Sequence, residues 1–540
     1  MARQRRICQF AAMPAAFAPL RHPAFRLLWW ANLAANIGLW VQNTGAGWMM
    51  TSLDPSPVMV SLVQAASMLP VFLLALPAGA LADIIDRRIY LIGAQAWVLT
   101  VAALLALLTW AGWIGPWGLL FFTFCIGMGN ALNFPAWAAT TPELVPREDL
   151  VQAIALNGIG FNLSRAVGPA IGGFVIALAG TETAFALNAV CFLTLLLSLL
   201  AWRREAPRSA MPPEHFLSAM RAGLRFVAAS PAMRATILRA CTFFFFTAAV
   251  WGMLPLVVRH KLGLGPESYG GMLGLMGIGA VATGFALPAL RLRLPTRGAM
   301  VTAFSLVSGA SLALLGVSNH WLPAGVSMLM FGAGWLAAAS TLQAAAQFAT
   351  PAWVRARALG IYQLCFFGAM TAGAVLWGWA GNVLGLEPAL LLAAGISAAV
   401  AIGVRGWRLD TAPANEPPAV AMPLPEAPAA ELRHILDEHS GRVLEVVRYT
   451  VDPADRDAFL AAMKEARRVR LRSGAVAWRL LEDVAHPERW IELWAVESWT
   501  EHLREAGRLD AADRHALARA AGFQTGEGPP EAARYLTVQP

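Results

Sequence analysis

The chain has 540 residues, of which 57% are hydrophobic and only 14% are charged. This composition excludes an ordinary soluble protein, in which about 25% of residues are charged, and favours a chain that crosses a membrane repeatedly. The formal net charge of +8 comes from arginines between the apolar stretches, so it gives no reason to expect a nucleic-acid partner.

Apolar stretches long enough to cross a membrane recur along the chain to about residue 406. A helix needs roughly 20 apolar residues to cross the hydrocarbon core. We therefore predict an all-α membrane body with about twelve transmembrane helices in two groups of six. The first six are expected at 24–50, 58–82, 89–111, 114–137, 155–179 and 182–202. The second six are expected at 234–258, 269–290, 298–318, 321–345, 357–382 and 387–405.

Arginines are concentrated in alternate loops: before the first span, after the second and fourth spans, and in the long loop after the sixth. The loops on the other side carry only Arg259 and Lys261. Because basic loops stay in the cytoplasm, we predict that both termini and the central loop are cytoplasmic. The body then divides into a first half at 1–202, a cytoplasmic loop at 203–233 and a second half at 234–409.

A short charged turn separates the second span from the third. It runs from Gly79 to Arg88 and contains Asp83, Asp86 and Arg87. The two arginines agree with the orientation bias, but acidic residues contribute little to orientation, so the aspartates need another explanation. The turn resembles the loop between the second and third helices of the major facilitator superfamily, Gly-x-Leu-x-Asp-x-x-x-Arg-Arg.

That resemblance implies two six-helix halves around a midplane cavity, which rock to expose a small-molecule substrate alternately on the two sides. In this family the acid of the turn braces the cytoplasmic side against the other half. The resemblance therefore gives Asp83 a conformational role, with Arg355 or Arg357 near its partner helix.

The fifth span contains glycines on both sides of a proline: Gly168, Pro169, Gly172 and Gly173. Proline removes a backbone hydrogen bond, and the glycines leave a flat surface for another helix. The alternative is that these glycines face lipid and have no role. The pattern resembles the Gly-Pro-x-x-Gly-Gly motif of export-type major facilitators. Glycines of the eighth span offer a matching surface: Gly270, Gly271, Gly274, Gly277 and Gly279.

Arg165 lies inside the same span, where an unpaired charge costs at least a few kcal/mol unless it faces water or a partner. We expect it to point into the cavity. It is then a substrate contact or a gating partner, or else it is a structural donor to backbone carbonyls. Arg239 lies nearer to a membrane interface, and we expect its side chain to extend to that interface.

Amides and aromatic residues inside the spans are further candidates for substrate contacts. The superfamily resemblance implies that helices one, four, seven and ten line the cavity. The amides are equally suited to contacts between helices, and they are Asn36, Gln42, Asn43, Asn130, Asn133, Gln343 and Gln347. The aromatic residues favour a large amphipathic substrate, and they are Trp40, Trp48, Phe134, Trp137, Trp251 and Trp335.

We expect no cofactor or metal. A phosphate-binding Gly-x-x-x-x-Gly-Lys-Ser/Thr loop is absent from the sequence, and the five cysteines lack the spacing of metal ligands. Proton antiport is what the superfamily resemblance implies. However, no carboxylate lies near the middle of a predicted span, and the nearest ones are at helix ends or in outer loops: Asp54, Glu182, Glu267 and Glu387.

After about residue 409 the long apolar stretches end. A linker rich in proline and alanine occupies 410–440. Beyond it, we predict strands at 443–451, 475–483, 490–498 and 533–538 and helices at 453–471, 499–506 and 510–521. This β-α-β-β-α-β order predicts a cytoplasmic ferredoxin-like α+β domain at 441–540. We expect four arginines to form a solvated face that could contact anionic lipid: Arg467, Arg468, Arg470 and Arg472.

Two sequence segments in this domain, 451–460 and 496–504, resemble the small domains of antibiotic-biosynthesis monooxygenases, which form dimeric barrels. A tail of this kind behind a major facilitator body is similar to the transmembrane secretion effector family, related to enterobactin-type siderophore exporters. The resemblance implies a homodimer through 441–540 or a regulatory role. Catalysis is the less favoured alternative, and its candidates by residue type are Trp478, Trp490, Trp494, Trp499, His486 and His502.

The sequence therefore predicts an exporter in the inner membrane of a bacterium, not an enzyme. Its partners are the lipid bilayer and a small amphipathic molecule, siderophore-like or drug-like. The alternatives are a membrane-tethered monooxygenase and a nutrient importer with the same fold.

Overall fold

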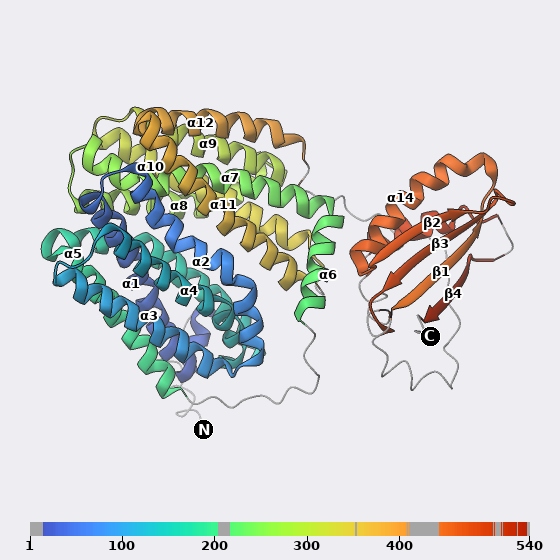
Figure 1. Cartoon of the computed structure of the whole chain (residues 1–540), viewed down its shortest axis with the longest axis horizontal. Coiled ribbons are helices and arrows are strands. Elements are labelled where there is room, and N and C mark those ends of the chain that lie inside the picture. The colour runs from blue at the N-terminus through green and yellow to red at the C-terminus, as the bar shows by residue number, and fades with distance from the viewer. Residues whose placement is uncertain are drawn as a thin grey trace, which may run out of the picture. The chain divides into compact units, whose positions relative to one another are not determined.

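The computed structural model describes residues 15–202, 216–351, 354–407, 409, 442–499, 502, 509, 511–525 and 528–536 (Figure 1). The chain divides into two compact units. Unit 1 comprises Met1–Pro212, Leu238–Gln343 and Tyr362–Trp407, and unit 2 comprises Pro213–Ile237, Ala344–Ile361 and Arg408–Pro540. Each unit is described by itself below.

The first set of helices in the membrane body follows the apolar stretches closely. Its members are η1 (Ala15–Arg21), α1 (Pro23–Leu53), α2 (Pro57–Ile84), α3 (Arg87–Trp110), α4 (Pro116–Leu144), η2 (Arg147–Asp149) and α5 (Leu150–Ala201). Prolines begin α1, α2 and α4, where the missing N–H costs nothing. Gly180 interrupts α5 with a φ of 83°, so two predicted spans form one continuous helical segment that bends at this glycine.

The second set is α7 (Pro231–Leu256), η3 (Val257–Lys261), α8 (Pro266–Arg293), α9 (Arg297–Val317), α10 (Trp321–Phe348), α11 (Arg355–Leu384), α12 (Leu386–Gly403) and η4 (Val404–Gly406). Among the described residues, ten helical segments are long and apolar enough to cross a membrane, and one of them is the 55-residue segment that contains α5. The body is therefore that of a multi-pass membrane protein.

The prediction that Arg239 extends to a membrane interface is wrong. Its side chain is 2% exposed and lies among α7, α9 and η4. Its Nε and Nη2 atoms donate to the Val404 carbonyl at 3.1 and 2.7 Å, and its Nη1 atom donates to the Gly298 carbonyl at 3.0 Å. Carbonyls after the last turn of a helix lack intrahelical partners, so α12 offers this guanidinium acceptors inside the protein.

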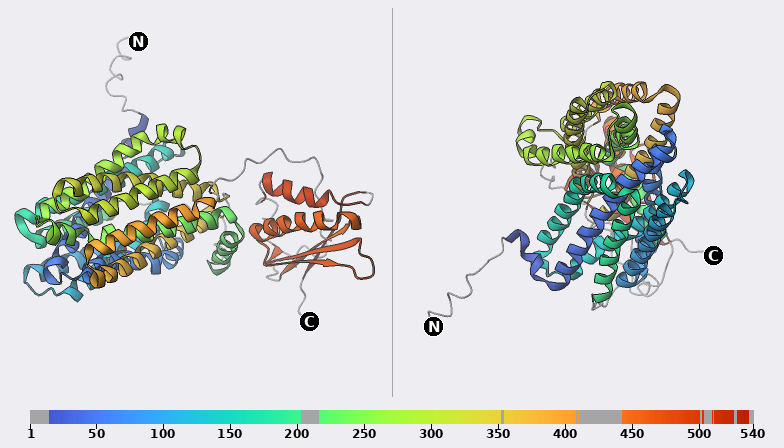
Figure 2. Two further views of the ribbon diagram at one scale, coloured as in Figure 1. Left: turned by 90° about the horizontal axis from the view of Figure 1, so that it is seen from above. Right: turned by 90° about the vertical axis from the view of Figure 1, so that its left-hand side faces the viewer.

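The C-terminal part of unit 2 is a four-stranded antiparallel sheet with helices on one face (Figure 2). Its elements are β1 (Val443–Thr450), η6 (Pro453–Asp455), α14 (Arg456–Ser473), β2 (Ala477–Glu482), β3 (Arg489–Val496), α16 (Ala511–Ala521) and β4 (Glu531–Leu536). The strand order is β2-β3-β1-β4. The four strands lie where the alternation predicts them, whereas most of the helix expected at 499–506 lies outside the described residues.

Unit 2 also contains a helix that hydropathy does not predict, α6 (Phe216–Ala229), in the central loop. At 14 residues it is shorter than a membrane span, so a search for long apolar stretches misses it. Within the unit, Arg225 of α6 forms an ion pair of 3.1 Å with Glu497 at the end of β3.

Candidate functional site

Aromatic rings from both sets of helices meet around Trp251 of α7. The Trp251 ring centroid lies 5.9 Å from that of Trp40 in α1. It lies 5.6 Å from Trp335 and 6.4 Å from Phe331, both in α10. Trp335 also packs against Phe244 of α7 at 5.4 Å. We call Trp40, Phe244, Trp251, Phe331 and Trp335 the aromatic seam, because α1 belongs to the first set and the other helices to the second.

The seam contains a polar group without a partner. The indole Nε1 of Trp251 is buried and has no hydrogen-bond acceptor among the described residues. A buried donor left unpaired costs about 1–3 kcal/mol. An acceptor atom on a bound molecule would remove this cost, so Trp251 offers a ligand both a flat apolar surface and one directed N–H.

Arg165 lies on the face of α5 between the directions of Gly172, which packs on α1, and Gly173, which packs on α8. On the same helix, Gly168 and Gly172 face α1, where an added Cβ would lie 2.6 Å from the Cβ of Trp40 and 3.1 Å from the Cα of Val41. At 100° per residue, Arg165 lies opposite the exposed lipid-facing side chains, Leu163, Val167 and Phe174. It is half-buried and forms no hydrogen bond or ion pair with another described residue. Residue 165 lies one helical turn before Gly168, the glycine that contacts Trp40.

The predicted glycine surfaces of α5 and α8 do meet. An added Cβ at Gly173 would lie 2.5 Å from the Pro266 carbonyl oxygen and 2.8 Å from the Gly270 Cα. An added Cβ at Gly277 would lie 2.8 Å from the Ala166 Cα. The backbones of the two sets therefore touch with no side chain between them. Two glycines of α8 lie elsewhere, since Gly271 faces open space and Gly279 packs on α10.

Comparison with known proteins identifies the family. The family of transmembrane secretion effectors matches residues 14–540. The chain belongs to this family. Enterobactin exporter EntS of Shigella flexneri is 26% identical over 380 residues, covering 67% of this chain and 86% of that protein. The uncharacterized MFS-type transporter YfiS of Bacillus subtilis is 26% identical over 349 residues, or 61% of this chain and 80% of YfiS. The staphyloferrin A transporter of Staphylococcus aureus is 28% identical over 165 residues, which cover 30% of this chain and 42% of that protein.

Solved structures show the same fold. A bacterial homologue of the human lysosomal transporter Spinster, in an inward-facing and occupied conformation, superposes with a TM-score of 0.59 at 13% identity, over 72% of this chain and 96% of that one. A POT family transporter in complex with 5-aminolevulinic acid superposes with a TM-score of 0.60 at 11% identity, over 71% of this chain and 96% of that one. This secretion effector is thus a multi-pass transporter of the major facilitator type.

In this transporter the charged turn after α2 is bonded within the first set of helices. The carboxylate of Asp86 caps α3 by accepting hydrogen bonds from the N–H groups of Arg88 and Ile89. Arg87 pairs with Glu143 of α4 at 2.6 Å, and Arg88 donates to the carbonyls that end α5. The side chain of Asp83 and the surroundings of Gly79 lie outside the described residues, so the brace assigned to Asp83 stays a prediction.

Two of the candidate amides bond to neighbouring helices, and a third bonds within its own helix. Gln42 is 1% exposed and accepts a hydrogen bond of 3.4 Å from Asn188 of α5. Asn133 accepts one of 2.7 Å from Gln95 of α3, and Asn36 donates to its own helix. Asn43 and Gln343 are half-buried and Gln347 is exposed. Trp40, Trp251 and Trp335 are the candidates that the structure brings together, and the role of the amides as substrate contacts stays a prediction.

Sequence reasoning missed Phe244 and Phe331. Their spacing contains the signal, because Phe331 and Trp335 are four residues apart and Phe244 and Trp251 are seven apart. Both spacings place two rings on one helix face. Because the chain has 26 phenylalanines, this signal alone does not separate a site from lipid contacts.

A buried carboxylate organises the C-terminal domain. Glu492 of β3 is fully buried and accepts hydrogen bonds from Tyr449 at 2.9 Å, Trp478 at 2.9 Å and Arg470 at 3.3 Å. The Arg470 guanidinium also lies 3.6 Å from the ring centroid of Trp494. Burial raises the pKa of the Tyr449 phenol well above its ordinary value, and the Glu492 carboxylate adds to this rise. Tyr449 is thus a permanent hydrogen-bond donor.

The expectation that Arg470 belongs to a solvated arginine face is therefore wrong. Phe459, Met463 and Ala466 form the buried face of α14, and residue 470 continues that face one turn later. Arg472 is bonded to Asp513 of α16, which leaves Arg467 and Arg468 on the exposed side.

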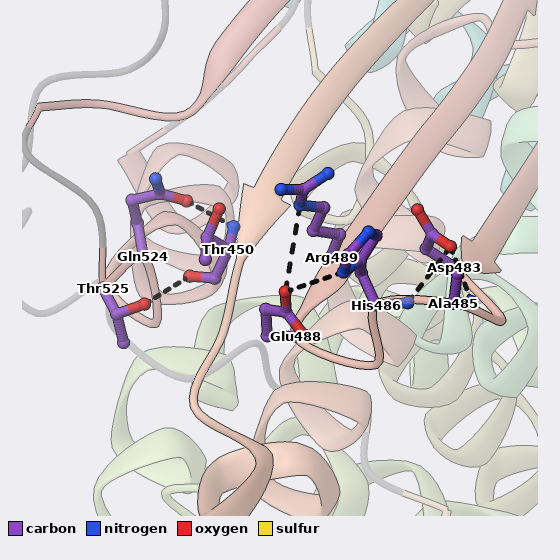
Figure 3. Close-up of polar contacts among 8 residues, drawn as sticks. All are labelled: Thr450, Asp483, Ala485, His486, Glu488, Arg489, Gln524 and Thr525. Atoms are coloured by element: carbon purple, nitrogen blue, oxygen red, sulfur yellow. Dashed lines mark hydrogen bonds and ion pairs between the residues drawn. The ribbon is translucent and has the colours of Figure 1, made fainter.

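The remaining candidates for catalysis lie in more than one part of the domain. Trp490 and Trp494 are core residues, 4% and 3% exposed. His486 lies in the exposed turn between β2 and β3, which Asp483 holds by accepting a backbone hydrogen bond from Ala485 (Figure 3). His502 contacts Glu445 at 2.5 Å, and its ring centroid lies 4.9 Å from that of Trp499.

Proposed function

We propose that this secretion effector exports a small amphipathic anion with aromatic groups, siderophore-like or drug-like, and that the substrate binds at the aromatic seam. The unpaired Trp251 N–H beside the rings of Trp40 and Trp335 is the observation that carries this proposal. Arg165 lies one helical turn from Gly168, which packs on Trp40 of the seam, and an intramembrane cation favours an anionic partner. The enterobactin exporters among the relatives support this substrate class.

Alternating access is supported by the packing of α5. The face that contains Arg165 is buried at Pro169, Gly172 and Ile176 but exposed at Phe161 and Asn162, toward the start of the helix. The space between the sets therefore opens toward the start of α5. The arginine distribution assigns this end to the cytoplasm, so the substrate would enter there.

Transport in inverted membrane vesicles tests this proposal. Uptake of siderophore-like and lipophilic drug-like compounds is measured under an imposed proton gradient and again after its collapse. We expect uptake of aromatic anions that stops when the gradient collapses. Uptake that persists without the gradient argues against proton coupling. Uptake only into right-side-out vesicles indicates an importer and contradicts the proposal.

Replacing Arg165 tests the substrate contact. Arg165→Gln is expected to lower uptake at subsaturating substrate about tenfold, because a hydrogen bond to a charged group contributes about 1.5–3 kcal/mol. Arg165→Lys keeps the charge and should restore most of the uptake. Both changes should have a similarly small effect on the uptake of a neutral substrate. If Gln and Lys variants lose uptake equally while remaining abundant in the membrane, the charge has no role.

The C-terminal domain is proposed to be ferredoxin-like and to form a homodimer through its sheet. Helices cover one sheet face, and on the opposite face Leu481 and Tyr535 are 45% and 46% exposed. Leu444 and Ile491, their cross-strand partners, make this face apolar. A second copy of the same face is the occupant we propose, since an Arg448–Glu531 ion pair of 2.9 Å on it provides both charges for a self-complementary contact.

Cross-linking of the full chain tests the dimer. In a variant without native cysteines, Tyr535→Cys is expected to form a disulfide-linked dimer in membranes under mild oxidation. Arg468→Cys, on the exposed side of α14, is the matched control and should stay monomeric. Cross-linking of the control alone would show that the helix face, not the sheet face, is the interface.

A further inference from the structure

The two sets of helices are joined at the end of α1 by one arginine. Arg259, in the π-helical turn η3, donates through Nη1 to Thr51 Oγ1 at 3.0 Å and to Ser52 Oγ. Its Cζ atom lies 5.2 Å from the ring centroid of Trp48. Thr51, Ser52 and Trp48 belong to α1, whereas Arg259 continues α7, so every one of these contacts crosses between the sets.

Trp48 is held by a second residue of the other set. Its ring stacks on Tyr269 of α8, with centroids 6.1 Å apart and planes inclined by 22°. The Tyr269 hydroxyl lies so close to α1 that an added Cβ at Gly47 would be 3.2 Å from it. Trp48 and Tyr269 are 8% and 6% exposed. We call Trp48, Thr51, Ser52, Arg259 and Tyr269 the Trp48 gate.

The backbone directs Arg259 to this position. Pro255 near the end of α7 has no N–H to donate, and the chain continues as a π-helical turn with Leu262 N bonded to the Val257 carbonyl. Two residues later, Lys261 pairs with Glu387 of α12 at 2.9 Å and donates to the Gly316 carbonyl of α9. Among the described residues, Lys261 thus bonds only within the second set and makes none of the contacts with α1.

The partners of Arg259 suit a contact that must break in every transport cycle. They are two hydroxyls and an aromatic face, and no carboxylate pairs with Arg259 in the part of the chain that the structure describes. Ion pairs with carboxylates are stronger than bonds to neutral acceptors, so a neutral set of partners separates more readily.

We propose that Arg259 is the gating residue that holds the transporter closed at the end of α1, opposite the end where the seam is open. This inference rests on the alternating access proposed above. When the sets separate at this end, Arg259 leaves Thr51 and Ser52, Trp48 leaves Tyr269, and the substrate is released.

A buried serine near the same end of the bundle can report this separation. Ser61 lies one turn after the start of α2, the helix that follows the end of α1. It is 1% exposed and packs on α7, where an added Cβ at Gly252 would be 2.6 Å from its hydroxyl. Separation of the two sets at this end would expose the side chain at position 61 to water.

Labelling of a cysteine at position 61 tests the gate without a substrate. In whole cells producing a full-length variant without native cysteines, Ser61→Cys is treated with a membrane-impermeant maleimide. We expect slow labelling in this background and about tenfold faster labelling after Arg259→Ala. Lys261→Ala removes the neighbouring cation, whose partners all lie in the second set, and should leave the labelling rate unchanged. Arg259→Lys, which keeps the cation over Trp48, should give an intermediate rate.

Two outcomes overturn the proposal: equal labelling rates with and without the Arg259→Ala change at matched membrane abundance, or equal acceleration by Lys261→Ala. Because labelling needs no substrate, a failed gate is distinguishable from a failed function. Normal uptake with unchanged labelling would reject the gate alone. Absence of uptake by the unaltered protein would reject the proposed function whatever the labelling rates.

Discussion

Replacing Gly173 with valine is expected to reduce export about a hundredfold. An added Cβ at this position would lie 2.5 Å from the Pro266 carbonyl oxygen and 2.8 Å from the Gly270 Cα. Both neighbours are backbone atoms, so no rotamer change relieves the overlap and α5 must separate from α8. Overpacking typically costs about 1–3 kcal/mol, and the upper end of this range corresponds to a hundredfold change in an equilibrium.

Gly158→Val is the matched control for this substitution. It makes the same chemical change on the same helix, with the same effect on helix propensity, but nothing lies within 4 Å of an added Cβ there. Uptake into inverted vesicles, normalised to the amount of protein in the membrane, separates the two variants. Comparable activity of both variants would mean that close contact between α5 and α8 is not required for transport.

Replacing Arg470 with alanine is expected to destabilise the C-terminal domain by about 3–5 kcal/mol. The change leaves Glu492, which is fully buried, without its charge partner, and removing one member of a buried ion pair costs this much. It also removes the guanidinium from the face of Trp494. Pulse proteolysis of the full chain in increasing urea, followed through a C-terminal tag, measures the loss as a lower unfolding midpoint.

Arg468→Ala is the control, since it truncates an arginine on the exposed side of the same helix and should change the stability by less than about 0.5 kcal/mol. Replacing both partners, with Arg470→Met and Glu492→Leu, should cost less than Arg470→Ala alone, because no charge is then left buried. A midpoint for Arg470→Ala equal to that of Arg468→Ala would contradict the role given to the pair.

Several features of the site follow from sequence patterns because short-range geometry decides them. The spacing of Gly168, Gly172 and Gly173 predicts a flat helix surface, and the structure shows this surface in contact with α1 and α8. The same spacing does not predict which glycines of α8 are used. Gly270 and Gly277 meet α5, whereas Gly279 meets α10, because the crossing of two helices selects only some of the residues on each face.

The two wrong predictions have one physical origin. Residue type alone places Arg239 and Arg470 in aqueous or interfacial surroundings, because arginine is rarely buried. In the structure both guanidiniums find acceptors on other elements, the Val404 carbonyl and the Glu492 carboxylate, which lie 165 and 22 residues away along the chain. The periodicity of α14 already places Arg470 on the buried face, so there the helix position is a better guide than the residue type.

Hydrophobicity and periodicity are enough to predict the membrane class, the positions of the long helices and the four strands of the tail. Each of these features belongs to a single helix or strand, and the apolar or alternating pattern of its own residues is enough to indicate it. The folded chain is needed to show that Trp40 and Trp335 both meet Trp251, that Gln42 and Asn133 bond to neighbouring helices, and that Arg259 joins α1 to η3. Such contacts join residues up to 211 positions apart (251 − 40) in the chain. They depend on the packing and relative rotation of whole helices, which a local pattern does not contain.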